Sequence, residues 1–261
     1  MFKRSLFVVA AFVPLVTHAE CKDFLRDWMQ QLHPGRDLEA DVVACKIWPA
    51  NPDLTLAALP LIPEDAHDVG ADDLEIVVAN TKTGEIIAHG FQRSTIARNN
   101  LRALQFDTAR YRLTPDRQAF GVRLRYWITG PKIGISASTL SLYTVDGRRV
   151  RPVLERVVVE KYTENWDGEL VSGKCTAGVI DDFKRSIAIG TAGRNGYATL
   201  KVSEKSVHTV YGRTDGCWHG PQSTPQTRIE ANVTGRTIEY YDGKYVVPES
   251  LVDLPKVLQA E

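Results

Sequence analysis

The segment LSLYTVDGRRVRPV (140–153) places a run of strand-forming residues on each side of an Asp-Gly pair. Leucine, tyrosine, threonine and valine suit strands. Asp-Gly between two such runs predicts a two-residue hairpin turn of type I′, in which both residues have positive φ. The same pair recurs in NWDGEL (165–170), GRTDGCW (212–218) and YYDGKY (240–245). The repeated pair predicts either the turns of an antiparallel β protein or a repeated calcium-binding loop.

The calcium alternative can be tested on the neighbours of each pair. An EF-hand-type loop needs oxygen ligands at positions one, three and five, glycine at six and glutamate at twelve. With the aspartate at position five, this pattern fails at Asp146, Asp215 and Asp242. Only Asp167 has oxygen-bearing side chains two and four residues earlier, and no glutamate follows at position twelve. We therefore predict hairpins at Asp146 and Asp242 and leave calcium open at Asp167 alone.

Runs of the same β type follow one another from residue 54 onward. Within AFGVRLRYWI (119–128), Val122, Leu124 and Tyr126 alternate with arginines, as in a strand with one apolar and one charged face. About a dozen such strands without a long helix between them favour antiparallel pairing over βαβ units. The sequence predicts a mainly β chain: an antiparallel sandwich or propeller-like body with one N-terminal helix.

The segment CKDFLRDWMQQLHPG (21–35) carries the one strong helix signal. Its apolar side chains recur with helical spacing and so share one face, and Pro34-Gly35 ends the segment. We expect this face to pack on the β body, with exposure for a partner as the alternative. The residues of the face are Phe24, Leu25, Trp28, Met29 and Leu32.

Residues 1–19 have the three parts of a secretory signal peptide. Two basic residues precede an apolar run at 6–16 that is too short to span a bilayer, and Ala19 ends the segment. We expect cleavage near Ala19, a periplasmic or secreted product, and no stable membrane insertion. A disulfide-stapled helical segment at 20–47 then precedes an all-β body at 48–261.

Four cysteines follow the predicted cleavage site: Cys21, Cys45, Cys175 and Cys217. An even number in an exported chain predicts two disulfides. Of the three possible pairings, proximity in the sequence favours Cys21–Cys45 and Cys175–Cys217. A zinc site is the alternative, but the chain has no C-x-x-C motif and no histidine pair beside the cysteines. We expect no bound metal.

The composition argues against several partners. The chain is 43% apolar and 25% charged, which is enough for a sizeable core, and its formal net charge is zero. Nucleic-acid and anionic-membrane binding usually require a basic excess. We expect neither. An arginine series on the middle strands predicts a solvated face, with an anion-binding surface as the alternative; it comprises Arg110, Arg112, Arg117, Arg123 and Arg125.

No catalytic motif emerges from the sequence. It lacks the G-x-S-x-G of serine hydrolases and the H-E-x-x-H of zinc proteases. The glycine-rich GTAGRNG (190–196) lies between two β-type runs and opens no helix, so it predicts a hairpin loop and not a phosphate cradle. We therefore expect no catalytic residue and no cofactor.

Two polar, glycine-rich loops, 161–182 and 212–226, are long enough to carry a site. The predicted bridge between Cys175 and Cys217 would join them at one end of the β body. The candidate ligand-binding residues of these loops are Asp167, Asp215, Trp218 and His219.

Three segments carry a resemblance to known proteins: FDTARYRLTPDRQAFGVRLRY (106–126), the following STLSLY, and YYDGKYVVP near the C-terminus. They resemble a group of uncharacterised exported proteobacterial β-rich proteins. The chain is also similar, more distantly, to periplasmic lysozyme-inhibitor and immunity-type proteins. This second resemblance implies a β-rich binder of a cell-wall hydrolase, and no functional residue is carried over from it.

These features predict an exported, non-catalytic binding protein with a protein partner in the cell envelope, in the manner of an inhibitor or immunity factor against an envelope-targeting enzyme. One alternative is a secreted hydrolase that uses His219 with Asp215 or Asp167 in the two polar loops. Another is a structural protein of the envelope. The sequence does not identify the ligand.

Overall fold

The computed structural model describes residues 21–63, 70–167, 177–211, 227–255 and 258 of the chain. These residues contain one α-helix, short 3₁₀ turns and two β sheets. The helix is α1 (Leu25–Leu32), and the strands are β1 (Ala44–Ile47), β2 (Leu54–Leu61), β3 (Ala71–Asn80), β4 (Ile86–Ala97), β5 (Leu101–Thr114), β6 (Arg117–Thr129), β7 (Ile133–Asp146), β8 (Arg149–Trp166), β9 (Gly178–Ala192), β10 (Ala198–Tyr211), β11 (Thr227–Ile238), β12 (Tyr240–Tyr241) and β13 (Lys244–Tyr245).

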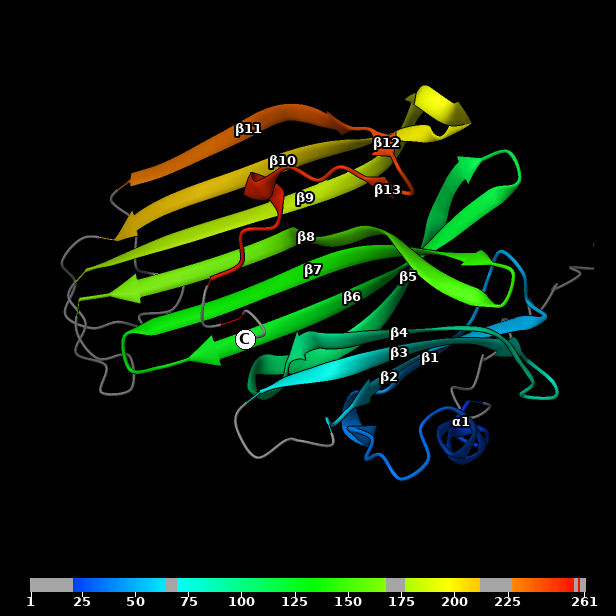
Figure 1. Cartoon of the computed structure of the whole chain (residues 1–261). Coiled ribbons are helices and arrows are strands. Elements are labelled where there is room, and N and C mark those ends of the chain that lie inside the picture. The colour runs from blue at the N-terminus through cyan, green and yellow to red at the C-terminus, as the bar shows by residue number, and fades with distance from the viewer. Residues whose placement is uncertain (1–20, 64–69, 168–176, 212–226, 256–257, 259–261) are drawn as a thin grey trace, which may run out of the picture.

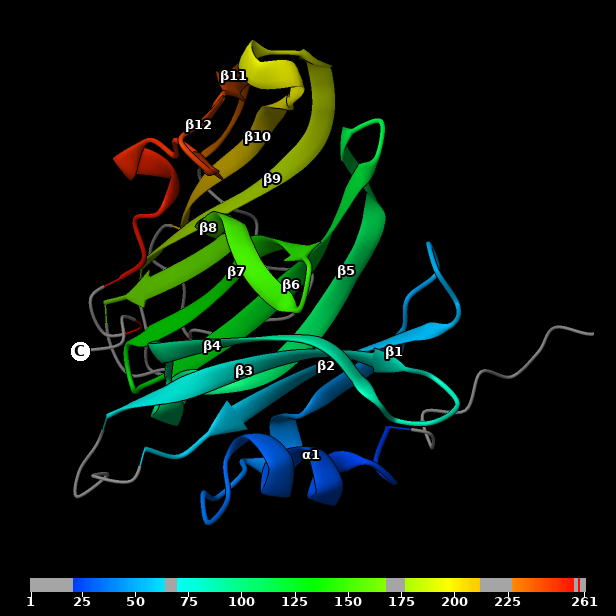
Figure 2. The same ribbon diagram turned by 45° about the vertical axis from the view of Figure 1, so that its right-hand side comes forward.

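Eleven strands form one large sheet in the described part of the chain. Its main path runs β1-β2-β3-β4-β8-β7-β6-β5, and β9, β10 and β11 continue from β8. Every pairing is antiparallel except the short parallel contact of β4 with β8, made at His89 and Arg149. β5 curves back to contact β1, which leaves the sheet nearly closed (Figures 1 and 2). The mainly β prediction is confirmed, whereas neither a sandwich nor a propeller is.

β8 is the strand at which the sheet branches, because one of its edges pairs with a single strand and the other with two. One edge pairs with β7 along most of its length. The other edge pairs with β4 at Arg149 and with β9 only from Glu160 onward. Between these two points the described residues add no further strand to this edge. The sheet therefore has an opening beside the middle of β8.

Both Asp-Gly hairpins between described strands form, but their turns differ. At Asp242-Gly243 both residues have positive φ, 46° and 88°, which confirms a type I′ pattern. The type I′ prediction for Asp146-Gly147 is wrong. Asp146 is still paired with Arg149, so the two turn residues are Gly147 and Arg148, and of these only Gly147 has positive φ, at 59°. The strand register moved the turn by one residue.

The core lies on both faces of the central strands. Val158 of β8 belongs to a cluster that faces β2–β4, while its neighbours Val157 and Val159 belong to a second cluster with residues of β10. Because successive strand residues point to opposite faces, the middle of β8 is buried on both sides. Large, fully buried members include Phe120, Leu140, Leu142 and Leu154.

A third cluster holds the N-terminal helix against the outer side of β2 and β3, below the sheet in Figure 2. Trp28 is the buried residue of α1, and its indole N–H donates to the Gly84 carbonyl at 2.6 Å. The predicted Cys21–Cys45 disulfide is confirmed and joins the start of this segment to β1. The apolar helix face therefore packs on the β body, as predicted.

Asp107 on β5 anchors part of the arginine series. The Nε and Nη2 atoms of Arg123 donate to Asp107 Oδ2 at 2.9 and 2.7 Å, and the Tyr111 hydroxyl donates to the same oxygen at 3.1 Å. Burial by itself would raise the pKa of Asp107, but the Ala109 N–H and the Arg123 guanidinium outweigh it and lower this pKa below its usual 3.8. At this position the arginine stabilises the sheet.

Asp107→Asn tests this anchor. A carboxyl group with a lowered pKa stabilises the fold above its unfolded-state pKa and loses that effect as the pH falls through the folded-state pKa. We expect the variant to lose about 1–3 kcal/mol at pH 7 and its deficit to shrink below about pH 4. Urea unfolding at pH 7, 5, 4 and 3 measures this difference. Asp116→Asn in the exposed β5–β6 turn is the control, and an equal deficit in both variants would contradict the assignment.

Candidate functional site

The sequence-predicted site residues fall mostly outside the described residues. Asp215, Trp218 and His219 lie there, as do Cys175 and Cys217 and residues 1–19. Asp167 is exposed just after β8, and its backbone N–H donates to the Ala177 carbonyl at 2.9 Å. The site in the two polar loops, its disulfide and the signal peptide therefore stay predictions.

The C-terminal segment crosses the opening of the sheet. It begins with a 3₁₀ turn at Glu249–Leu251 and then runs past β8 and β7 (Figure 1). Leu251 is buried in the cluster on the β10 side, whereas Leu254 and Leu258 are buried in the cluster that faces β2–β4. These three leucines attach the segment to both parts of the core.

Arg185 of β9 holds this segment through its guanidinium group. Nε donates to Glu204 Oε2 at 2.6 Å, and the group lies 4.3 Å above the Phe183 ring. Nη1 donates to the Val158 carbonyl at 2.9 Å and to the Leu251 carbonyl at 3.4 Å, and Nη2 to the Ser250 carbonyl at 3.3 Å. The cation thus links the free edge of β8 to the C-terminal segment.

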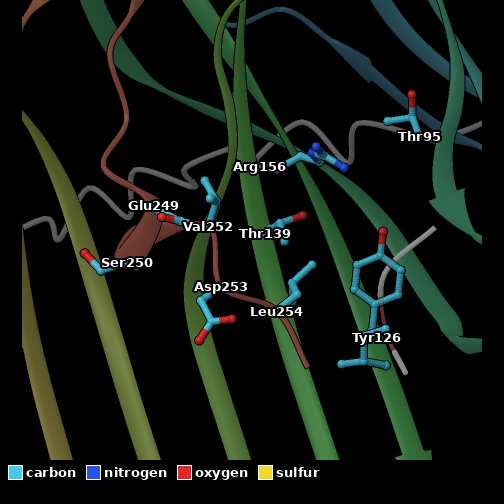
Figure 3. A pocket seen from close by; sticks show the side chains of 10 residues that line it. Thr95, Tyr126, Thr139, Arg156, Glu249, Ser250, Val252, Asp253 and Leu254 are labelled. Atoms are coloured by element: carbon cyan, nitrogen blue, oxygen red, sulfur yellow. The ribbon is translucent and has the colours of Figure 1, made fainter. Parts of the chain in front are cut away.

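A cavity of about 640 Å³ lies between this segment and the sheet (Figure 3). This volume is within the range of small-molecule sites, about 300–1,000 Å³. One wall comes from β4, β6, β7 and β8 and the other from the C-terminal segment. The lining residues are Thr95, Tyr126, Thr139, Arg156, Glu249, Ser250, Val252, Asp253, Leu254 and Leu258.

Arg156 reaches the cavity because of a β-bulge in β8. Leu140 pairs with Val157 and Leu142 with Leu154, so Glu155 and Arg156 together oppose the single residue Ser141. Arg156 has φ 49°, a left-handed conformation that is strained for a bulky side chain. The Ser141 hydroxyl accepts its backbone N–H at 3.0 Å and holds the bulge in place. Strain of this kind often marks functional positions.

The Arg156 side chain is exposed and lines the cavity together with the hydroxyl groups of Tyr126 and Thr139. In Figure 3 its guanidinium, the Thr139 hydroxyl and the Tyr126 hydroxyl point towards a common region. Among the described residues, no hydrogen bond or ion pair involves this guanidinium. Burial raises the pKa of Tyr126, despite the Ala97 N–H and the Arg156 charge, so its phenol stays protonated. This wall offers one cation and neutral hydroxyls.

The opposite wall is acidic. Glu249 and Asp253 project from the C-terminal segment, on the other side of the cavity from Arg156 in Figure 3. Both side chains are exposed. Ser250 adds a hydroxyl, and Val252 and Leu254 supply apolar contacts. The cavity therefore separates positive from negative charge across its width.

A second polar cluster lies beneath α1, on the outer side of the sheet. Glu75 is fully buried, and its two oxygens contact His33 Nε2 at 2.7 Å and His89 Nδ1 at 3.1 Å. Beside it, Arg36 pairs with Asp73 at 2.8 Å. The carboxylate itself is inaccessible to solvent. We interpret the cluster as part of the attachment of the N-terminal helix.

The described residues lack two features, a cluster of metal-ligand side chains and a membrane-spanning helix. They contain no group of three or more histidine, cysteine, aspartate or glutamate side chains arranged to hold a metal ion. None of their helices has the length and apolar content needed to cross a bilayer. Comparison with protein-family models, curated proteins and solved structures finds no match for the chain.

Sequence reasoning missed the cavity residues, although one signal was present. In PVLERVVVE (152–160) two charged residues stand together between apolar ones and break the alternation expected of a strand. Such a break is typical of a bulge. The break predicts an irregularity of the strand at Glu155 and Arg156, but it does not predict that the C-terminal segment lies opposite Arg156.

Arg185→Met tests the attachment of the C-terminal segment. The change removes a largely buried cation and leaves Glu204 and three carbonyls without this donor, so we expect a loss of about 3–5 kcal/mol. Limited proteolysis should also cut the C-terminal segment faster than in the wild type. Arg151→Met is the control: its ion pair with Asp146 is half-exposed, and about 1 kcal/mol or less should be lost. Equal cutting rates in both variants would contradict the role of Arg185.

Glu75→Gln tests the cluster beneath α1. The carboxylate of Glu75 offers one oxygen to each histidine, whereas the amide of the variant has a single oxygen and an NH2 group that cannot accept. We therefore expect a loss of about 1–3 kcal/mol in unfolding free energy. Hydrogen exchange should show weaker protection of α1, while the β5–β8 strands are little changed. Glu85→Gln, at an exposed position of the β3–β4 loop, is the control. Unchanged protection of α1 would show that the cluster does not hold the helix.

Proposed function

We propose that this chain is an exported, non-catalytic binding protein whose ligand occupies the cavity between β8 and the C-terminal segment. The single observation that carries the proposal is Arg156. A β-bulge and the Ser141 hydroxyl hold its backbone in a strained conformation, while its guanidinium faces a cavity of ligand size. A strained, accessible cation of this kind is better suited to contact a ligand than to support the fold.

The chemistry of the lining favours binding over catalysis. The Tyr126 phenol is protonated at neutral pH and burial raises its pKa further, so it is a hydrogen-bond donor and a poor base. The Thr139 hydroxyl can donate or accept, the Thr95 hydroxyl, which donates to the Arg93 carbonyl, can accept, and the Ser250 hydroxyl, which accepts from Arg236, can donate. Such a lining orients a ligand by shape and hydrogen bonding, which is the usual composition of a binding pocket.

Export is the second part of the proposal. The Cys21–Cys45 disulfide is typical of oxidising compartments, and the sequence of residues 1–19 has the pattern of a signal peptide. Both observations support a periplasmic or secreted protein. Fractionation of cells followed by mass spectrometry of the mature N-terminus tests this part. A cytoplasmic protein that retains residue 1 would contradict it.

A protein partner in the envelope, as for an inhibitor or immunity factor, is a second candidate. The β6–β7 hairpin exposes two apolar side chains, with Trp127 56% and Ile133 40% accessible. Exposed tryptophan is frequent at the centre of protein interfaces. This surface and the cavity are separate features, so a Trp127→Ala variant that loses capture of an envelope enzyme but keeps its small ligand would assign the partner to the hairpin.

The cavity proposal is tested by a binding screen with matched variants. Thermal-shift and calorimetric titrations would use free amino acids, tripeptides, monosaccharides, fatty acids and nucleoside monophosphates as probes. We expect one class to bind and Arg156→Gln to weaken it about 10- to 150-fold, as for loss of a charged hydrogen bond of about 1.5–3 kcal/mol. Arg125→Gln, on the outer face of β6, should bind normally. The proposal fails if no class binds, or if both variants behave alike.

A further inference from the structure

We infer that the cavity recognises a zwitterion with separated charges, specifically a short peptide with free amino and carboxyl termini. The inference rests on the proposed function, since it names the ligand class of the same site. Its starting point is the charge distribution of the lining. Arg156 stands on the sheet wall, and Glu249 and Asp253 stand on the wall of the C-terminal segment (Figure 3).

This distribution disfavours ligands that carry one sign of charge. A simple anion bound at Arg156 would face two carboxylates, and a simple cation bound at those carboxylates would face the guanidinium. Like charges that face each other across a partly enclosed site are costly because screening there is weaker than in water. A ligand with one anionic and one cationic end can place its anionic end at Arg156 and its cationic end at the two carboxylates, and only this orientation pairs opposite charges.

The groups between the charged walls match a peptide backbone. The Thr139 hydroxyl can both donate and accept. The Thr95 hydroxyl donates to the Arg93 carbonyl at 3.2 Å and can still accept, and the Ser250 hydroxyl accepts from Arg236 at 2.8 Å and can still donate. The Tyr126 phenol is protonated. A peptide presents N–H and C=O groups that need donors and acceptors in turn. A neutral sugar would also use the hydroxyls, but it would leave the charges on both walls without partners.

Geometry also suits the terminal carboxylate. Guanidinium binds carboxylates with two parallel hydrogen bonds, and the Arg156 guanidinium has no other such partner among the described residues. The bulge fixes the direction from which it enters the cavity. Val252, Leu254 and Leu258 leave apolar surface for small side chains. The structure thus assigns the carboxyl terminus to Arg156 and the ammonium terminus to Glu249 and Asp253.

Four forms of tri-alanine separate these contributions: the free peptide, its N-acetyl form, its C-terminal amide and the doubly blocked peptide. Calorimetry with the wild-type protein should show binding of the free peptide. Each block should weaken that binding about tenfold or more, the equivalent of about 1.4 kcal/mol.

Variants assign each end to its wall. The Arg156→Gln variant should bind the free peptide and its C-terminal amide with equal affinity, and it should still bind the N-acetyl form more weakly than the free peptide. The double variant Asp253→Asn, Glu249→Gln should bind the acetylated and free peptides with equal affinity, and it should still bind the C-terminal amide more weakly than the free peptide. Arg125→Gln should retain the wild-type order. Circular dichroism melting of each variant verifies that it is folded before titration.

The outcomes distinguish the ligand class from the function. If blocked and free peptides bind the wild-type protein equally, or if the variants leave both preferences intact, the inference is wrong. If no peptide binds while another class in the screen binds through Arg156, the inference fails and the binding function stands. If no class binds, both fail. Selective loss of one preference in each variant supports the inference.

Discussion

The fold depends on how the two edges of β8 are shared. One edge is paired with β7, and the other is divided between β4 at its start and β9 at its end. A strand has only two edges, so the interval between β4 and β9 needs other partners for its backbone. The Val158 carbonyl accepts a hydrogen bond from Arg185 there, and the same guanidinium binds the C-terminal segment. The opening, its cover and the cavity all follow from this division.

The features that the sequence predicted are those decided by neighbouring residues. Positive φ at Asp242 and Gly243 follows from the turn itself, and the packed face of α1 follows from helical spacing. The Cys21–Cys45 bridge closes a short loop. The type I′ prediction at Asp146 failed because pairing with Arg149 extends β7 into the expected turn. Where register and turn propensity disagreed, register determined the outcome.

The sheet order and the cavity could not be predicted because alternation identifies faces but not neighbours. Nothing within β4 or β8 indicates that they touch in parallel at His89 and Arg149. The apolar character of Leu254 and Leu258 predicts burial, but not that they enter a core built by β2–β7. The irregular pair at residues 155–156 was visible in the sequence, yet its meaning depends on a segment almost a hundred residues away.

The buried ion pairs of the molecule contrast with the position of Arg156. Asp72 pairs with Arg98 at 2.6 Å, Asp73 with Arg36, and Asp107 with Arg123. In each pair the carboxylate is largely buried and the cation compensates its desolvation. Arg185 follows the same rule with Glu204. A bulge and the Ser141 hydroxyl fix the backbone of Arg156, but the carboxylates of its cavity lie on the opposite wall. A carboxylate of a ligand would complete at Arg156 the pairing that the protein supplies elsewhere from its own side chains.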